Sequence, residues 1–208
     1  MLQFKHLKHI PFIEHGITEA HDSPPQNFMR GEQIHSNHVV WIEHLTSNEI
    51  PQADALLTKE KNIPIAVVTA DCIPLILADL NSGVVGVIHA GWRGTVARIV
   101  EKTLQLLNVN LNNLKIGLGP AICPRHFIVG EEVAQQFDPQ FIQKSEIEPQ
   151  KYYVDLWEAN KHQILQCGVP KQNIEVMRVC TFESPTLFSY RRDKTKQRNY
   201  GFIKILNG

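Results

Sequence analysis

Three nearly continuous apolar runs occupy the centre of the chain, and they restrict its fold more than any other feature. They are PIAVVTA (64–70), IPLILAD (73–79) and VVGVIHA (84–90), and only Asp71 and Cys72 separate the first from the second. Runs of this length have the size of strands, and their unbroken apolarity predicts strands that are buried on both faces. None approaches the roughly 18 apolar residues needed to span a membrane, so we expect no membrane partner.

Weaker signals predict the elements around these strands. Helices are expected at 95–109, 130–137 and 155–168, with Thr95 and Asp155 as N-caps, Glu158 completing a capping box and Gly168 as a stop. Further strands are expected at 39–45, 114–119, 174–179 and 202–206, and surface loops at 20–32 and 190–200. The pattern predicts a mixed α/β fold in a single domain over residues 1–208.

Charge and cysteine content exclude several classes of protein. The 21 basic side chains balance the 21 acidic ones, which argues against a nucleic-acid partner. The four cysteines form no CxxC pair, so a disulfide scaffold is not expected. The first residues lack the clean apolar stretch of a signal peptide. Together these features favour a cytoplasmic protein.

Two histidines and one cysteine lie at predicted strand ends and form the main chemical constellation. His35 precedes the 39–45 strand, Cys72 interrupts the central apolar runs, and His89 ends the next strand. Imidazole and thiolate suit Zn²⁺, and three protein ligands leave a fourth position for water or substrate. The same residues also allow a metal-free pair in which His89 activates Cys72 as a nucleophile, or ordinary packing roles.

Arginines supply the candidate anion sites. Arg93 lies in the GWRG turn at a predicted helix start, where a guanidinium and helix amides can hold an anion together. Arg191 and Arg192 belong to a basic cluster with Lys194, Lys196 and Arg198, which is either a binding site or a solvated face.

The loop GPAICPRHFIVGEE (119–132) follows a strand, and loops in that position often line sites. Cys123 and His126 within it resemble a second metal pair. Because the neighbouring sequence offers no further ligand, we do not expect a metal there.

Seven segments in this order resemble the bacterial laccase-domain family, labelled multicopper polyphenol oxidases and understood as zinc purine nucleoside phosphorylases. They are GEQIHSNHVV (31–40), ADALLT (53–58), TADCIPLILAD (69–79), GVIHAGWRGTVARIV (86–100), GPAICPRHFIVGEEV (119–133), VDLWEANKHQILQCGV (154–169) and CTFESPTLFSYRRD (180–193). The resemblance implies a single layered α/β/β/α domain with mixed sheets, similar to the deamidase toxins of the cytotoxic necrotizing factor type.

The resemblance also implies an activity. Carried over residue by residue, the zinc ligands fall on His35, Cys72 and His89. The implied reaction is phosphorolysis of adenosine, inosine, guanosine and methylthioadenosine to the free base and a ribose 1-phosphate or methylthioribose 1-phosphate, with adenosine deamination as a second activity. Two departures stand out: the segment before Gln33 is short, with Arg30 as a substitute for the family's Asn-Arg pair, and the 125–128 loop lacks the family's carboxylate.

Phosphorolysis assigns roles to particular side chains. A phosphate nucleophile requires cations, for which Arg93, Arg191 and Arg30 are the candidates. Deamination requires a carboxylate that moves protons, and Asp71 either does this or orients a ligand histidine. The expected catalytic set is therefore Cys72 and His89 together with Asp71 and Arg93.

Three other classes remain as alternatives: a copper-dependent polyphenol oxidase, a metal-free Cys-His hydrolase or amidase, and a non-enzymatic binding protein. The oxidase is disfavoured because none of the ten histidines forms the His-X-His pairs of multicopper sites, although copper can occupy such ligands in vitro. The sequence leaves a monomer and a homodimer equally open.

Overall fold

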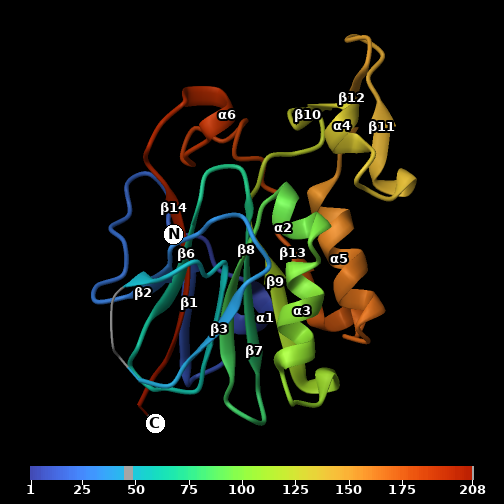
Figure 1. Cartoon of the computed structure of the whole chain (residues 1–208). Coiled ribbons are helices and arrows are strands. Elements are labelled where there is room, and N and C mark those ends of the chain that lie inside the picture. The colour runs from blue at the N-terminus through green and yellow to red at the C-terminus, as the bar shows by residue number, and fades with distance from the viewer. Residues whose placement is uncertain (45–48, 208) are drawn as a thin grey trace.

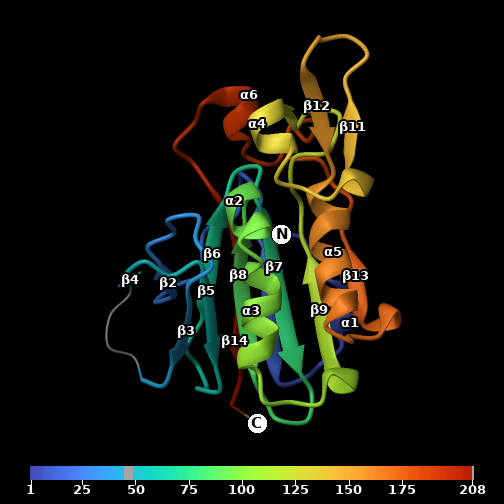
Figure 2. The same ribbon diagram turned by 45° about the vertical axis from the view of Figure 1, so that its right-hand side comes forward.

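Two β-sheets pack face to face, and helices cover the outer face of the larger one in the computed structural model, which describes residues 1–44 and 49–207 (Figures 1 and 2). The three central apolar runs form β6 (Ile65–Thr69), β7 (Ile73–Asp79) and β8 (Val85–Ala90), as the sequence predicts. β7 and β8 lie in the larger sheet and β6 lies in the smaller one, so the chain changes sheets at Asp71 and Cys72.

The larger sheet has six strands in the order β13-β9-β7-β8-β5-β3. The four not yet given are β13 (Ile174–Val176), β9 (Leu114–Leu118), β5 (Ala55–Thr58) and β3 (Val39–Ile42). β7 is antiparallel to both β8 and β9, and β5 is antiparallel to β8, whereas the outer pairs β13–β9 and β3–β5 are parallel.

The second sheet has five strands in the order β1-β14-β6-β2-β4, and a third sheet of three strands, β10-β12-β11, projects beyond them. Their bounds are β1 (Ile13–Ile17), β14 (Asn199–Ile205), β2 (Met29–Gly31), β4 (Glu49–Ile50), β10 (Ile128–Gly130), β12 (Lys151–Val154) and β11 (Ile142–Lys144). The strands β1, β2, β5 and those of the third sheet are too short or too mixed in polarity to be predicted from the sequence.

Helices are short apart from two. The bounds are α1 (Lys5–Lys8), α2 (Trp92–Val96), α3 (Ile99–Leu106), α4 (Glu131–Ala134), α5 (Leu156–Gln166) and α6 (Tyr190–Asp193), with 3₁₀ turns η1 (Leu111–Asn113), η2 (Pro139–Phe141) and η3 (Lys171–Asn173). α3 and α5 both pack on the six-stranded sheet (Figure 2). Among the described residues no helix of comparable length covers the five-stranded sheet, so the expected fourth layer is not formed. No described helix has the length and apolarity to cross a membrane.

Burial on both sides explains the unbroken apolarity of the central strands. Side chains alternate along β7: Ile76 and Ala78 face the core between the two sheets, whereas Leu75 and Leu77 face the core beneath α3 and α5. A strand with one solvated face shows alternating polarity, whereas every residue of β7 is buried and the strand has no solvated face. The protein therefore has two hydrophobic cores, one on each face of the six-stranded sheet.

The single helix predicted over 95–109 is wrong in two respects: the helical segment starts earlier, and it is divided into two helices. Helix α2 already begins at Trp92, with Gly91 as its N-cap, and Arg98 interrupts the helical path with a left-handed backbone (φ +59°) before α3 begins. Thr95 is no cap, because its hydroxyl donates to the Gly91 carbonyl four residues earlier. The GWRG segment is thus the first turn of a helix.

The predicted helix over 155–168 is confirmed in its capping. Asp155 accepts a hydrogen bond from the Glu158 amide, and Gly168 takes a positive φ of 96° just after α5. The other predictions need smaller corrections. The predicted 39–45 strand ends at Ile42, and its last residue, Leu45, lies outside the described part. The predicted 130–137 helix is shortened to α4. Two of the expected loops contain regular elements: β2 lies within 20–32, and α6 and the start of β14 lie within 190–200.

Candidate active site

The strand order brings four functional residues to one end of the six-stranded sheet. Because β8 runs antiparallel to β7 and β5, its carboxyl end lies beside the amino ends of both. His89 near the end of β8 therefore meets Cys72, which directly precedes β7, and Asp54, which directly precedes β5. His35 comes from the loop that leads into β3, the parallel neighbour of β5.

The structure assembles the predicted His35–Cys72–His89 cluster. One donor atom from each residue lies within 4.8 Å of the other two. The two imidazole rings meet edge to face, with centroids 4.8 Å apart. His89 is buried, Cys72 is half-buried and His35 is exposed, so the cluster opens to solvent on one side. An open three-donor cluster of nitrogen and sulfur is the arrangement of catalytic zinc sites.

The Asp54 carboxylate holds two of these residues in place. It is fully buried, and it accepts hydrogen bonds from the backbone amides of Ile34, His35 and Ser36, from the Ser36 hydroxyl, and from His89. The three amides lie in a turn where His35 has a left-handed backbone (φ +61°), a conformation that costs energy for a residue with a side chain. The carboxylate stabilises that turn and so points His35 at the cluster. Sequence reasoning missed Asp54, although it lies within the quoted ADALLT segment.

The bond to Asp54 also fixes the tautomer of His89. Its Nδ1 lies 2.8 Å from the Asp54 carboxylate, which requires the proton on Nδ1. The other ring nitrogen, Nε2, is then the one available to the Cys72 side. A carboxylate behind a histidine in this way is the usual support of a metal-ligating imidazole. The structure gives this supporting contact to Asp54, whereas the sequence offered Asp71 for it.

The side chains in the cluster shift one another's proton affinity. Burial by itself raises the pKa of Cys72, but the imidazoles of His89 and His35 outweigh it and lower that pKa to about 6. Burial by itself lowers the pKa of His89, but the Cys72 thiolate and Asp54 raise it to about 9. At neutral pH without a metal, the pair is therefore a thiolate and an imidazolium.

Gly91 is required by the close approach of the backbone to the cluster. A Cβ placed on this residue would lie 2.9 Å from the Cys72 sulfur and 3.1 Å from the His35 ring. Both distances are below normal van der Waals contact, so only glycine leaves the two donor groups where they are. The glycine of the HAGWRG segment thus has a steric role that its spacing alone does not reveal.

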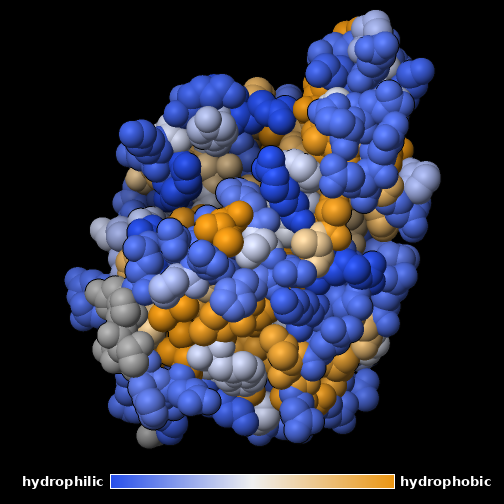
Figure 3. Space-filling model, in the orientation of Figure 1, coloured by the Kyte–Doolittle hydropathy of each residue, from blue (hydrophilic) through white to orange (hydrophobic). Residues whose placement is uncertain are grey.

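A cavity of about 670 Å³ opens beside the cluster. This size is typical of sites that bury a small organic ligand. The surrounding upper part of the face in Figure 3 is largely hydrophilic, as expected for a polar ligand. Besides the three cluster residues, the lining includes Arg30, Gln33, Asp71, Trp92, Phe127, Tyr190, Arg191 and Arg198.

The structure sorts the predicted arginines. Arg191 and Arg30 line the cavity, whereas Arg93 is exposed and lies over the Trp92 ring at 4.3 Å without lining it. The Arg191 guanidinium donates from one nitrogen to the carbonyls of His126 and Ile128, which leaves its other nitrogens for a ligand. Arg30 pairs with Glu49.

Asp71 lines the cavity with both carboxylate oxygens engaged. One accepts from the Thr181 hydroxyl at 2.7 Å and the other from the Arg191 amide at 2.6 Å. Its backbone is left-handed (φ +93°), an unusual state for a residue other than glycine. Asp71 therefore ties the β6–β7 crossover to the start of α6.

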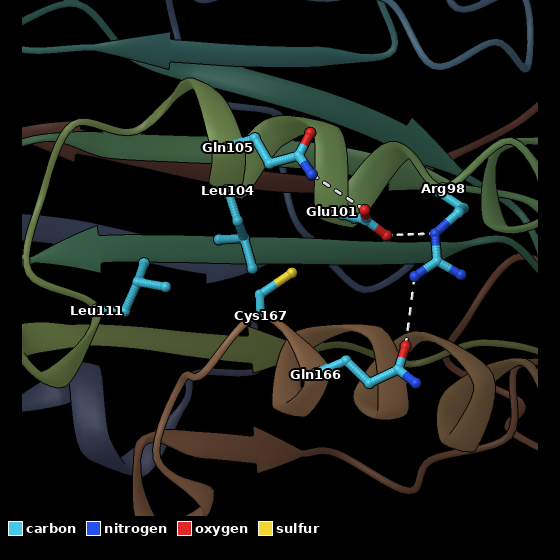
Figure 4. Close-up of a pocket in the computed structure, with 7 residues that line it drawn as sticks. All are labelled: Arg98, Glu101, Leu104, Gln105, Leu111, Gln166 and Cys167. Atoms are coloured by element: carbon cyan, nitrogen blue, oxygen red, sulfur yellow. Dashed lines mark hydrogen bonds and ion pairs between the residues drawn. The ribbon is translucent and has the colours of Figure 1, made fainter.

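A second hollow lies between α3 and α5 (Figure 4), and its lining includes none of the cluster residues. It measures about 340 Å³, and none of the sequence-predicted site residues lines it. Arg98 spans it, pairing with Glu101 and donating to Gln166. Burial raises the pKa of Cys167 beside them, which makes this thiol less reactive than a free one.

The fold and the cluster define an α/β protein with an open centre of two histidines and one cysteine, which lies at the strand ends of the six-stranded sheet. The family described as "Multi-copper polyphenol oxidoreductase laccase" matches residues 14–206, and the chain belongs to it. The resemblance read from the sequence segments is thereby confirmed.

Curated relatives carry names from purine metabolism. A purine nucleoside phosphorylase of Bacteroides thetaiotaomicron is 40% identical over 67% of this chain and 55% of its own length. One from Deinococcus radiodurans is 37% identical over 80% of this chain and 65% of its own length. Adenosine deaminase RL5, from an unknown prokaryotic organism, is 36% identical over 67% of this chain and 56% of its own length. The chain therefore spans between about half and two thirds of these relatives.

Solved structures share the fold. YlmD from Geobacillus stearothermophilus superposes with a TM-score of 0.84 at 25% identity, over 95% of this chain and 93% of that one. A Bacillus licheniformis protein called YfiH superposes with a TM-score of 0.80 at 25% identity, over 86% and 74% of the two chains. The mixed-sheet α/β architecture is thus that of known folds.

Replacing Asp54 by asparagine tests its role behind the cluster. The amide lacks the charge and one acceptor oxygen, so it supports His89 and the His35 turn less well. We expect zinc affinity to fall about 10- to 100-fold. Competition with a chromogenic chelator measures this, and Asp138→Asn, on an exposed turn outside the described metal-binding groups, is the control. Unchanged affinity would contradict the role given to Asp54.

Replacing Gly91 by alanine tests the steric requirement at the cluster. The new methyl group displaces Cys72 or His35, so zinc binding should weaken by about 10-fold or more while the fold persists. Gly83→Ala is a useful contrast because a Cβ there meets no atom within 4 Å, although its φ of +71° costs some stability. The same chelator competition applies, with thermal melts of both variants. Equal affinities in the two variants would argue against the close approach.

Proposed function

We propose that this protein is a purine nucleoside phosphorylase with zinc held by His35, Cys72 and His89. The observation that supports this most strongly is that the three donors meet at the wall of one cavity, which Arg30, Arg191 and Arg198 also line. The names of the curated relatives support the same reaction class. The ligands we propose are purine nucleosides and phosphate, in a cytoplasmic setting.

The residues present fit the proposed metal. The donor set is two imidazoles and a thiolate, which zinc prefers, and Asp54 presents His89 through Nε2 as a neutral ligand. The lowered pKa of Cys72 favours the thiolate form that a metal requires. Copper accepts the same ligands, so copper loading in vitro is expected when copper is supplied. When bound, the metal supplies Lewis-acid stabilisation of negative charge.

The cavity-lining side chains account for the rest of the reaction. As the N-glycosidic bond breaks, its electron pair goes to the purine, which leaves as the free base after taking up a proton. The positive charge that develops on the sugar is met by a phosphate oxygen, which forms the new bond to the anomeric carbon. Arg191 and Arg30 supply the cationic contacts for phosphate, whereas Arg93 lies outside the cavity lining. Trp92, Phe127 and Tyr190 supply aromatic surface for the purine. The proposed substrates are adenosine, inosine, guanosine and methylthioadenosine.

Adenosine deamination is the second activity that we propose for the same cavity, since one relative is named an adenosine deaminase. Asp71 is the carboxylate within the lining that the sequence offered as a proton carrier. Both of its oxygens already accept short hydrogen bonds. For Asp71 to move a proton it must release Thr181 or Arg191, so we place phosphorolysis first.

The geometry also favours a second candidate function, a metal-free cysteine hydrolase or amidase. The Cys72 nucleophile contacts the His89 base, and His89 in turn contacts the Asp54 carboxylate that orients it. This is the arrangement of a catalytic triad. The thiolate–imidazolium pair described above is the activated form of such a site. The two candidates differ in the need for metal and phosphate.

An activity assay on the purified protein separates these functions. With adenosine, inosine or methylthioadenosine we expect base release that requires phosphate and is lost in Cys72→Ala, because a metal ligand is gone. Arg191→Ala should raise the KM for phosphate about 10-fold or more, since a charged hydrogen bond contributes about 1.5–3 kcal/mol. Chromatography of free base and inosine is the measurement, and Cys167→Ser is the control. Absence of base release from zinc-loaded protein would refute the phosphorylase assignment.

Alkylation of metal-stripped protein tests the electrostatics of Cys72. Only the thiolate reacts, so the rate with iodoacetamide should rise with pH and reach half its maximum near the pKa of about 6. Cys167, whose pKa is raised, should react only at alkaline pH, and peptide mass spectrometry resolves the two sites. Added zinc should protect Cys72. A Cys72 profile with the alkaline midpoint of an ordinary thiol would contradict the ion pair with His89.

A further inference from the structure

A second cluster of metal-binding side chains lies on the loop behind the cavity wall. Cys123, His126 and Glu183 each place one donor atom within 4.8 Å of the other two. The Cys123 sulfur lies 3.6 Å from Oε1 of Glu183, and Nε2 of His126 lies 3.0 Å from the same oxygen. The first two residues come from the 119–132 loop, and the third comes from the segment after β13.

These separations match the edges of a zinc coordination tetrahedron. Zinc bonds of about 2.3 Å to sulfur, 2.05 Å to nitrogen and 2.0 Å to oxygen give ligand-to-ligand distances of about 3.5 Å for sulfur–oxygen and 3.3 Å for nitrogen–oxygen. The distances of 3.6 and 3.0 Å in the structure differ from these values by only a few tenths of an ångström. No large rearrangement is needed for an ion to replace the hydrogen bonds.

The backbone already holds the two segments together. The Ala121 amide donates to the Val179 carbonyl, the Thr181 amide donates to Ala121, and the Cys123 amide donates to the Cys180 sulfur at 3.2 Å. The His126 ring stacks on Phe182 with centroids 4.1 Å apart. The donors therefore come from a preorganised frame, which lowers the entropic cost of binding an ion.

We propose that Cys123, His126 and Glu183 form a second metal site, separate from the active centre, that takes a divalent transition ion of the zinc type. The chemistry of the set is one thiolate, one imidazole and one carboxylate, whose two negative charges balance the ion. The loop sequence alone argued against this site because it showed no third ligand. Glu183 lies 57 residues beyond His126, and only the fold brings it near.

Competing contacts do not prevent the ion from binding. Arg125 pairs with Glu183 at 2.8 Å, but its side chain is 79% exposed, and an exposed ion pair contributes little. Burial and the neighbouring Cys180 thiol raise the pKa of Cys123 to about 12 without a metal. Coordination must therefore displace the thiol proton, and binding should tighten as the pH rises.

A metal here would stiffen the wall of the active cavity. Ile122 and Phe127, which flank the two loop donors, line that cavity. Arg191, a proposed phosphate contact, donates to the His126 carbonyl at 2.8 Å, and Arg192 donates to the Phe182 carbonyl at 3.1 Å. The ion would cross-link the loop to the segment that carries both arginines, so its role is structural.

Zinc counting in a background without the first site tests the proposal. The double variant His35→Ala/Cys72→Ala is dialysed against zinc under reducing conditions, and bound metal is measured by elemental analysis. We expect one ion per chain, and none after adding Cys123→Ser or His126→Ala. Glu183→Gln, a milder change, should weaken binding about 10-fold or more. Cys167→Ser, which alters another half-buried thiol, is the matched control and should retain the ion.

Cobalt gives a direct readout of sulfur ligation in the same background. Cobalt(II) added to the double variant should produce a thiolate charge-transfer band that Cys123→Ser abolishes and Cys167→Ser leaves intact. Thermal melts establish that each variant is folded. A double variant that binds no zinc, or one whose zinc and cobalt band survive Cys123→Ser, would overturn the proposal.

The test is independent of the proposed active centre. If both sites bind, the unmutated chain carries two ions and Cys123→Ser carries one. If only the second site binds, the unmutated chain and the double variant each carry one ion, and Cys123→Ser carries none. That outcome supports the second site while refuting zinc at His35, Cys72 and His89.

Discussion

One buried carboxylate, that of Asp54, determines the geometry on which the active centre depends. Transfer of an ionised carboxylate from water into a protein interior is costly unless hydrogen bonds replace its hydration. Asp54 is fully buried and receives five such bonds, three of them from consecutive amides. The charge is stable only when the 34–36 turn and His89 take their observed positions. The cost of burial therefore selects a single arrangement of both histidines.

The same charge controls the chemistry of the cluster. Hydrogen bonds from His89 and Ser36 lower the pKa of Asp54 against the opposing effect of burial, so the group stays ionised at neutral pH. An ionised Asp54 keeps a proton on Nδ1 of His89 and increases the electron density at Nε2. That nitrogen can ligate a metal or stabilise the Cys72 thiolate. Both proposed functions thus depend on the ionised Asp54 behind His89. They differ in whether a metal ion or only the substrate occupies the open side of the cluster.

The sequence predicts those parts of the protein in which neighbouring residues carry the signal. The central strands are predictable because double-sided burial leaves an unbroken apolar run, and Cys72 and His89 are visible because polar residues interrupt those runs. Asp54 lies between two alanines, and its contacts to His35 and His89 lie 19 and 35 residues away. No local pattern encodes such pairings. Arg93 shows a different limit of local patterns: its place at a helix start predicted an anion contact, but its exposed side chain lies over the Trp92 ring and outside the cavity lining, so that contact stays a prediction.

The 180–192 segment connects the active cavity with the second cluster. Arg192 donates from one nitrogen to the carbonyls of Thr181, Phe182 and Ser184, so it holds the turn that carries Glu183. Asp71, at the crossover between the sheets, receives the Thr181 hydroxyl and the Arg191 amide. Neither Arg192 nor Asp71 is easily displaced, because each lost hydrogen bond leaves a charged group poorly solvated. If Glu183 binds an ion as proposed, these bonds connect it to Arg191, so we expect the ion to affect the proposed phosphate contact more than the His35–Cys72–His89 cluster.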